Sequence, residues 1–141
     1  VLMLNKRIVD FIKKHHLLTL ATSKENVPYC ANVFYIYDKK NNSLIFSSDI
    51  KTRHAQEFSE NSNVAGTIAL ETKDVKKIQG VQLLGKITKL KGVKLEKYSK
   101  QYLNAYPYAR TMIPLFWEMK LTFIKMTHNQ LGFGKKLVWE K

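Results

Sequence analysis

The chain has 141 residues, of which 45% are hydrophobic and 25% charged, enough for one compact core but too little for two. We therefore expect a single domain over residues 1–141. Its 24 lysines and arginines outnumber 11 aspartates and glutamates, giving a formal net charge of +13. The positive electrostatic field of such a chain attracts anions, which favours an acidic ligand over a basic one.

The basic excess consists mainly of lysine, because only Arg7, Arg53 and Arg110 are arginines. Proteins that read nucleic-acid bases favour the planar, bidentate arginine side chain, so this composition argues against a nucleic-acid partner. The lone Cys30 excludes an internal disulfide and, without a recognisable secretory leader, predicts a reducing cytoplasm. No apolar run approaches the roughly 20 residues needed to span a bilayer, so no membrane partner is expected.

The hydrophobic periodicity predicts helices and strands in a regular order along the chain. Helices are expected over residues 4–15, 52–60 and 93–105, and strands over 17–22, 29–37, 44–48, 64–70, 77–90, 115–126 and 131–139. Hairpin-linked strands lose their exposed edges most completely by closing on themselves. The predicted fold is mainly β, a β-barrel of six to seven antiparallel strands with peripheral helices.

Two of these strands have informative side chains. Neither face of the strand over residues 29–37 is wholly polar, so we expect both to be covered and Cys30 to be a buried small residue. Gly85 interrupts the strand over residues 77–90 and predicts a barrel corner, with a bulge or the close approach of another backbone or a ligand as the alternatives.

A cluster of anion-binding side chains separates a predicted strand end from a predicted helix start. It runs from Ser47 to His54 and contains hydroxyls, a lysine, an arginine and a histidine. Helix N-termini attract phosphate, which makes this a candidate phosphate site. The alternative is that Thr52 only caps the helix while Lys51 and Arg53 point into water.

Side chains suited to catalysis are otherwise scarce. The histidines lack metal-ligand spacing with one another or with Cys30, so no metal site is expected, and no nucleophile motif is present. Any reaction would therefore depend on a bound cofactor.

The order of these segments resembles the FMN-binding split-barrel superfamily of pyridoxamine 5'-phosphate oxidase, and most closely its YhbP-like branch. The resemblance rests on stretches that keep their order over nearly the whole chain: Leu17–Thr22, Pro28–Tyr35, Phe46–Ser48, Lys51–Gln56, Gln79–Gln82, Tyr106–Pro107 with Ala109–Arg110, and Leu131–Lys136.

This resemblance implies a homodimer with one FMN in each of two clefts between subunits. It implies that the FMN phosphate is held by Ser47, Ser48, Lys51, Thr52 and Arg53, with His54 assisting where the superfamily has lysine. The flavin ring is then expected along Cys30, Ala31, Asn32, Val33 and Phe34, with contacts from Gln79, Gly80 and Lys135. The substrate-binding pattern of the oxidase itself is not reproduced, so a different small-molecule substrate is expected.

Other ligands are compatible with parts of this pattern. The superfamily includes deazaflavin and haem binders, and a haem would take His54 or His128 as its axial ligand. A non-enzymatic single-stranded nucleic-acid binder is a third hypothesis, because Phe34, Tyr35 and Tyr37 place aromatic rings on one strand of a basic barrel.

Overall fold

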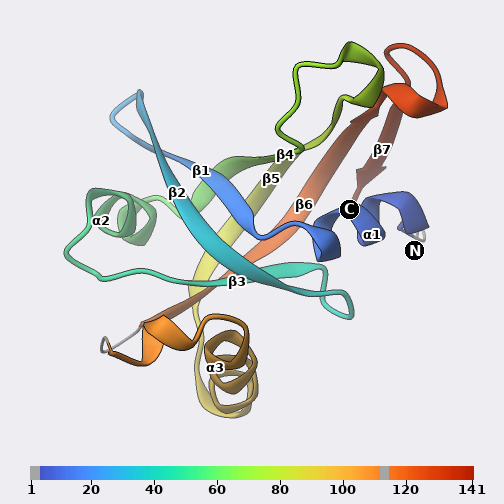
Figure 1. Ribbon diagram of the computed structural model, residues 1–141. Helices are drawn as coiled ribbons and strands as arrows, with labels where there is room; N and C mark the ends of the chain where they lie inside the picture. Colours follow the sequence, from blue (N-terminus) through green and yellow to red (C-terminus); the bar gives the residue numbers. More distant parts are fainter. Residues whose placement is uncertain (1–3, 112–114) are drawn as a thin grey trace.

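A curved antiparallel sheet forms the body of the molecule in the computed structural model, which describes residues 4–111 and 115–141 (Figure 1). Within these ranges the strand order is β3-β2-β1-β4-β5-β6-β7, and β3 also pairs with β6, which closes the barrel. The strands are β1 (Leu17–Lys24), β2 (Val27–Asp38), β3 (Ser43–Ser47), β4 (Asn63–Ala69), β5 (Gln79–Lys89), β6 (Phe116–His128) and β7 (Lys136–Glu140). The predicted mainly-β barrel is confirmed.

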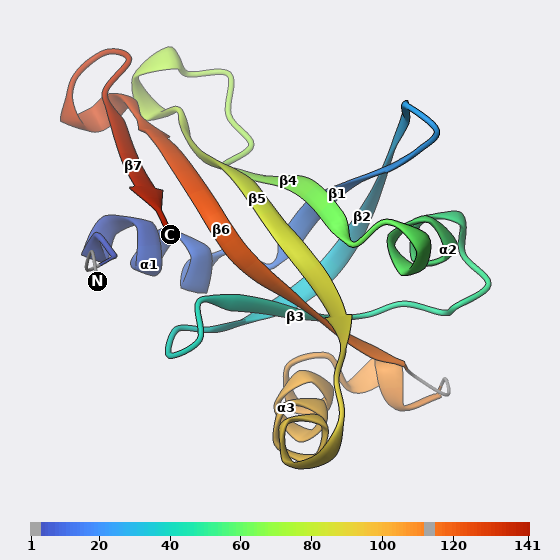
Figure 2. The ribbon, with the colours of Figure 1, turned by 180° about the vertical axis from the view of Figure 1, so that it is seen from behind.

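Helices surround the barrel, as predicted. The α-helices are α1 (Lys6–Lys14), α2 (Arg53–Glu60) and α3 (Gly92–Ala105), and the short 3-10 helices are η1 (Val75–Lys77), η2 (Pro107–Thr111) and η3 (Asn129–Leu131). Seen from the two opposite sides, α1 and α2 lie at opposite flanks of the barrel (Figures 1 and 2). No helix in the described ranges is both long and apolar enough to cross a membrane.

The β1–β2 hairpin turns on two residues with left-handed backbone. Glu25 and Asn26 have φ angles of 51° and 67°, as the tight two-residue turns that match strand twist require. The hairpin pairs Lys24 with Val27 and continues in register to Leu17 and Phe34.

Tyr35 and Tyr37 of β2 face the core. Tyr35 is buried and its hydroxyl donates to the carbonyl of Ile12 at 2.7 Å, while the Tyr37 hydroxyl donates to Asn42 Oδ1 at 2.7 Å. Phe34 lies on the other face and is 50% exposed. The row of stacking aromatics that favoured a nucleic-acid binder is therefore absent from β2.

The outer face of β2 corrects another expectation. Cys30 is exposed rather than buried, as are Asn32 and Phe34 on the same face. The face that carries Val33 and Tyr35 packs into the core. On the opposite face α3 covers only the C-terminal end of β2, where the Tyr98 hydroxyl donates to the buried Asp38 at 2.6 Å.

Glycines shape the barrel where β5 meets β6 and where β6 leads into β7. The β5–β6 register shifts between Leu84 and Gly85, so the ladder is irregular at the glycine where a barrel corner was expected and a bulge was the alternative. Beyond β6 the expected strand begins later than predicted: Asn129–Leu131 is a 3-10 helix, and β7 starts only at Lys136. Between this 3-10 helix and β7, Gly132 and Gly134 have φ angles of 139° and 72°. These positive angles are incompatible with extended strand backbone, which explains why the strand does not begin before Lys136.

Candidate functional site

The start of α2 is organised by Thr52. The Thr52 hydroxyl accepts a hydrogen bond from the Ala55 N–H at 3.3 Å and donates to the Asp49 carbonyl at 2.7 Å. Thr52 is thus the N-cap of α2, which agrees with the capping role given above as the alternative to a phosphate site. In the described part of the chain, the N–H groups of Arg53 and His54 have no hydrogen-bond partner. The helix start therefore retains two backbone donors that an anion could use.

Ser48 and His54 form a polar pair beside these donors. Ser48 Oγ lies 2.8 Å from His54 Nε2, and Ser48 is almost fully buried. The carbonyl of Ser48 is fixed by the indole N–H of Trp117 at 3.0 Å. Burial lowers the pKa of His54 below its ordinary value of 6.5, so its imidazole is mainly neutral near pH 7. In this position His54 acts as a hydrogen-bonding group more than as a cation.

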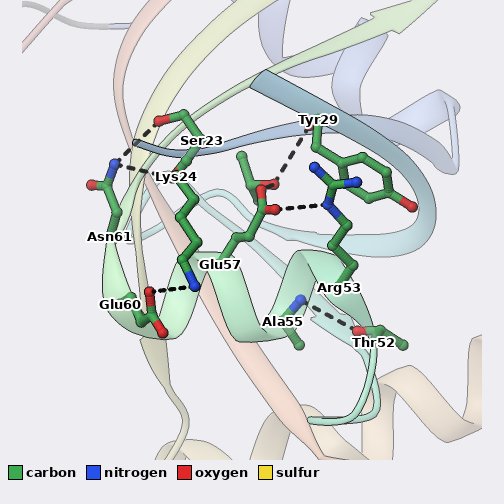
Figure 3. A network of polar contacts seen from close by, with 10 residues as sticks. Ser23, Lys24, Tyr29, Thr52, Arg53, Ala55, Glu57, Glu60 and Asn61 are labelled. Atoms are coloured by element: carbon green, nitrogen blue, oxygen red, sulfur yellow. Dashed lines mark hydrogen bonds and ion pairs between the residues drawn. The ribbon is translucent and has the colours of Figure 1, made fainter. Parts of the chain in front are cut away.

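Arg53 is engaged with its neighbours and does not simply point into water (Figure 3). Its Nε donates to Glu57 Oε2 at 2.8 Å, and its guanidinium lies 4.1 Å from the centre of the Tyr29 ring. The side chain remains 54% exposed. Arg53 is therefore held against the Tyr29 ring of β2 while about half of its side chain stays exposed.

Glu57 connects α2 to the barrel. This buried carboxylate accepts hydrogen bonds from Arg53 and from the Thr22 hydroxyl at 2.8 Å. These two hydrogen bonds, that of Arg53 first, lower the pKa of Glu57 and keep it ionised. Neither Glu57 nor Tyr29 was among the predicted site residues. The four-residue spacing of Arg53 and Glu57 was a signal for their contact, whereas the position of Tyr29 depends on the hairpin.

The edge of β2 next to α2 is open. Residues Val27 to Phe34 pair with β1, but pairing with β3 begins only at Tyr35. An unpaired edge presents free backbone N–H and C=O groups. Val33 is buried in the core, so its side chain cannot line a ligand as expected, while Ala31 is half-buried. Asn32 Oδ1 accepts a hydrogen bond from the Thr19 hydroxyl at 2.8 Å.

The remaining predicted residues fall into two separate groups. Ser47 ends β3 and Lys51 is exposed in the turn before α2, so both lie near Ser48. Gln79 and Gly80 begin β5, where Gly80 pairs with the last residue of β4. Lys135 precedes β7 in the neighbouring loop, on the flank opposite α2 (Figure 1). Within one chain, the residues at the start of α2 and those around the start of β5 and β7 therefore lie apart.

His128, the other predicted haem ligand, lies opposite Gln79 in the β5–β6 ladder. Its Nδ1 is buried without a hydrogen-bond partner among the described residues. Over residues 4–111 and 115–141, no cluster of three or more histidine, cysteine or acidic side chains could hold a metal ion.

Comparison with known proteins identifies the family. Residues 4–129 match the family described as pyridoxamine 5'-phosphate oxidase. The chain belongs to this family. It is 42% identical over 129 residues to UPF0306 protein YhbP of Salmonella paratyphi A, covering 92% of this chain and 88% of the relative. The resemblance seen in the sequence is confirmed.

Solved structures extend the comparison to more distant members of the fold. A haem-binding protein from Mycobacterium smegmatis superposes with a TM-score of 0.81 at 15% identity, over 99% of this chain and 60% of that chain. An FAD-binding protein from Mesorhizobium loti superposes with a TM-score of 0.70 at 14% identity, over 87% of this chain and 94% of that chain. Both comparisons show a shared fold.

Proposed function

We propose that this protein is a cytoplasmic FMN-binding flavoprotein, an oxidoreductase of a small molecule, with the FMN phosphate at the start of α2. The observation that carries the proposal is the set of free donors there: two backbone N–H groups beside the Ser48–His54 pair. The membership of the pyridoxamine 5'-phosphate oxidase family supports a flavin as the ligand.

The charges around this helix start suit a phosphate. Lys51 is exposed and has no ion-pair partner among the described residues, and its backbone N–H donates to Asp49 Oδ1 at 2.9 Å. Arg53 is partly neutralised by Glu57, but its side chain remains 54% exposed. The helix dipole adds to these two cations. Ser48, Lys51, Arg53 and the free N–H groups would hold the phosphate, with Ser47, Thr52 and His54 at its border.

A homodimer would complete the site. The outer face of the sheet carries apolar side chains that this chain leaves open, including Leu17, Phe34 and Leu84 at 43%, 50% and 49% exposure. A hollow of about 350 Å³ lies on the same face, lined in part by Cys30, Ala65 and Phe123. Contiguous exposed apolar surface is typical of an interface. Pairing across this face would let β5 and Lys135 of a second copy approach the open edge of β2.

Bound FMN would supply electron or hydride transfer, a chemistry that the side chains of this chain cannot provide. The protein's part would be to fix the phosphate at α2 and to offer the backbone groups of β2 to the ring. Cys30, Asn32 and Phe34 would border the ring from the outer face, and Gln79 and Gly80 would reach it from the second copy.

Titration of FMN with the purified protein, followed by quenching of flavin fluorescence, tests the proposal. Saturable quenching is expected in the parent, and Ser48→Ala should weaken FMN binding about tenfold, because a hydrogen bond to a charged group contributes about 1.5 kcal/mol. Lys51→Ala should weaken it similarly. Lys100→Ala, which removes an exposed lysine of α3 instead, should leave the affinity unchanged.

The outcome that contradicts the proposal is an absence of quenching, or equal affinity in the parent and in Ser48→Ala and Lys51→Ala. The visible spectrum of the same protein separates the other ligands, since a Soret band that survives gel filtration would indicate haem. Salt-sensitive binding of a generic oligonucleotide would indicate the nucleic-acid hypothesis. Gel filtration with light scattering tests the homodimer.

A further inference from the structure

A second cavity lies on the opposite flank of the barrel from α2. It has a volume of about 830 Å³, opens to solvent, and is lined by α1, the β2–β3 turn, the middle of β6 and the end of β7. Figures 1 and 2 show these elements converging near the C-terminal end of the described chain, far from α2. The volume is within the range of roughly 300–1,000 Å³ typical of small-molecule sites.

The wall of this cavity is apolar. Leu4 and Val9 line it from the α1 side, and Leu121 and Trp139 line it from β6 and β7. Val9 and Leu121 belong to the buried part of the chain, so the wall continues the hydrophobic interior. A site with these walls favours an aliphatic or aromatic group over a fully polar molecule.

The rim is strongly basic. Lys6 is paired with Asp10 at 2.7 Å, but five further lysines line the cavity without an ion-pair partner among residues 4–111 and 115–141: Lys13, Lys39, Lys40, Lys120 and Lys141. Glu140 is the remaining carboxylate at the rim. Like charges held around one opening repel each other, and Asp10 and Glu140 offset only part of the charge of these lysines, so an anion placed among them relieves the remaining repulsion.

The turn between β2 and β3 adds a polar group to the same wall. Asn42 lines the cavity, and its side-chain oxygen already accepts from Tyr37. Its Nδ2 is buried without a hydrogen-bond partner in the described part of the chain. A buried donor without a partner is costly, and because this nitrogen is closed off from the cavity, Asn42 contributes to the wall rather than to binding of a head group.

We propose that this cavity binds a single-chain amphiphile with an anionic head group, its apolar tail on Leu4, Val9, Leu121 and Trp139 and its carboxylate or phosphate among the rim lysines. The site is separate from the α2 site and does not depend on FMN binding. The proposal also assigns a function to part of the lysine excess of the chain, because five lysines without an ion-pair partner among the described residues would attract the anionic head group.

The test uses the full chain with dodecanoate and dodecyl phosphate as probes, below the concentrations at which they form micelles. Calorimetry should show saturable binding, and tryptophan fluorescence should change with it because Trp139 lines the cavity. Trp139→Phe should remove most of the fluorescence change. Dodecyltrimethylammonium, which has the same tail with a cationic head, should bind at least tenfold more weakly.

Charge reversal at the rim provides the matched comparison. Lys39→Glu/Lys40→Glu changes two adjacent exposed lysines of the β2–β3 turn and should weaken dodecanoate binding at least tenfold. Lys76→Glu/Lys77→Glu changes an adjacent exposed pair in η1, away from the cavity, and should change it less than twofold. Circular dichroism of both variants checks that the fold is kept.

Several results would overturn the proposal. They are the absence of saturable binding, equal affinity for the anionic and cationic amphiphiles, or equal losses in the two double variants. Co-sedimentation with phosphatidylglycerol vesicles, without binding of the monomeric probes, would show that the lysines face a membrane surface instead. Binding of only one of the two probes would support the site and identify its head group as carboxylate or phosphate.

Discussion

Phe58 is the side chain that anchors α2 to the barrel, and its removal is expected to destabilise the protein strongly. The ring is 2% exposed. Its centroid lies 4.7 Å from that of Trp117 and 5.9 Å from that of Phe46, both in edge-to-face geometry. Trp117 in turn holds the Ser48 carbonyl, so the packing of Phe58 supports the predicted phosphate site.

The expected magnitude follows from these contacts. Phe58→Ala removes a fully buried ring and should lower the free energy of unfolding by about 3–5 kcal/mol. Phe58→Leu keeps most of the apolar burial but loses two aromatic pairs, each contributing about 0.5–1.5 kcal/mol. The leucine variant should therefore lose about 1–3 kcal/mol, clearly less than the alanine variant.

Urea unfolding at a fixed protein concentration, followed by tryptophan fluorescence, measures both losses. Phe133→Ala is the control, because Phe133 is 87% exposed and its removal should leave the unfolding midpoint unchanged. A loss below about 1 kcal/mol in Phe58→Ala would refute the assignment of Phe58 as the anchor of α2. So would equal effects of Phe58→Ala and Phe133→Ala.

Two further predictions concern pH and the barrel bulge. Because burial places the pKa of His54 below 6.5 in the folded state, the unfolded chain takes up that proton first, so stability should fall as the pH drops through 6.5. His54→Gln should flatten this dependence in urea titrations between about pH 5 and pH 7, and an unchanged slope would contradict the assignment. Gly85→Ala would place a Cβ 2.6 Å from the Lys120 carbonyl oxygen, so it should cost about 1–3 kcal/mol. Gly80→Ala, whose nearest contact is 3.2 Å, should cost less in the same thermal or urea assay.

The helices and the hairpin were predictable because their signals are local. Apolar residues at helical spacing placed α1, which the structure begins at Lys6 and ends at Lys14. Thr52 before a run of helix formers placed the start of α2 within one residue. In both cases the residues that decide the structure lie within one or two turns of each other.

The environment of β2 was less predictable because it depends on distant parts of the chain. Alternation showed that neither face is wholly polar, but it could not show that Cys30 and Phe34 would remain exposed in this chain. The pairing of Arg53 with Tyr29 likewise requires the hairpin to lie against α2.

The candidate site was predictable only in part. The anion-binding stretch from Ser47 to His54 is contiguous, so the sequence located it directly. Gln79 and Lys135 came from the resemblance to a family, and the structure places them on the opposite flank from α2. The neutral state of His54 follows from burial, which residue spacing does not reveal.

The pairing of β3 with both β2 and β6 has a consequence for synthesis of the chain. Ser43 pairs with Lys120, so one side of this short strand has no partner until most of the polypeptide has left the ribosome. Contacts of such large sequence separation form slowly because a long loop must close first. During translation β3 therefore exposes an apolar edge that invites pairing with other nascent chains. A chaperone that shields this edge before β6 emerges should raise the yield of folded protein.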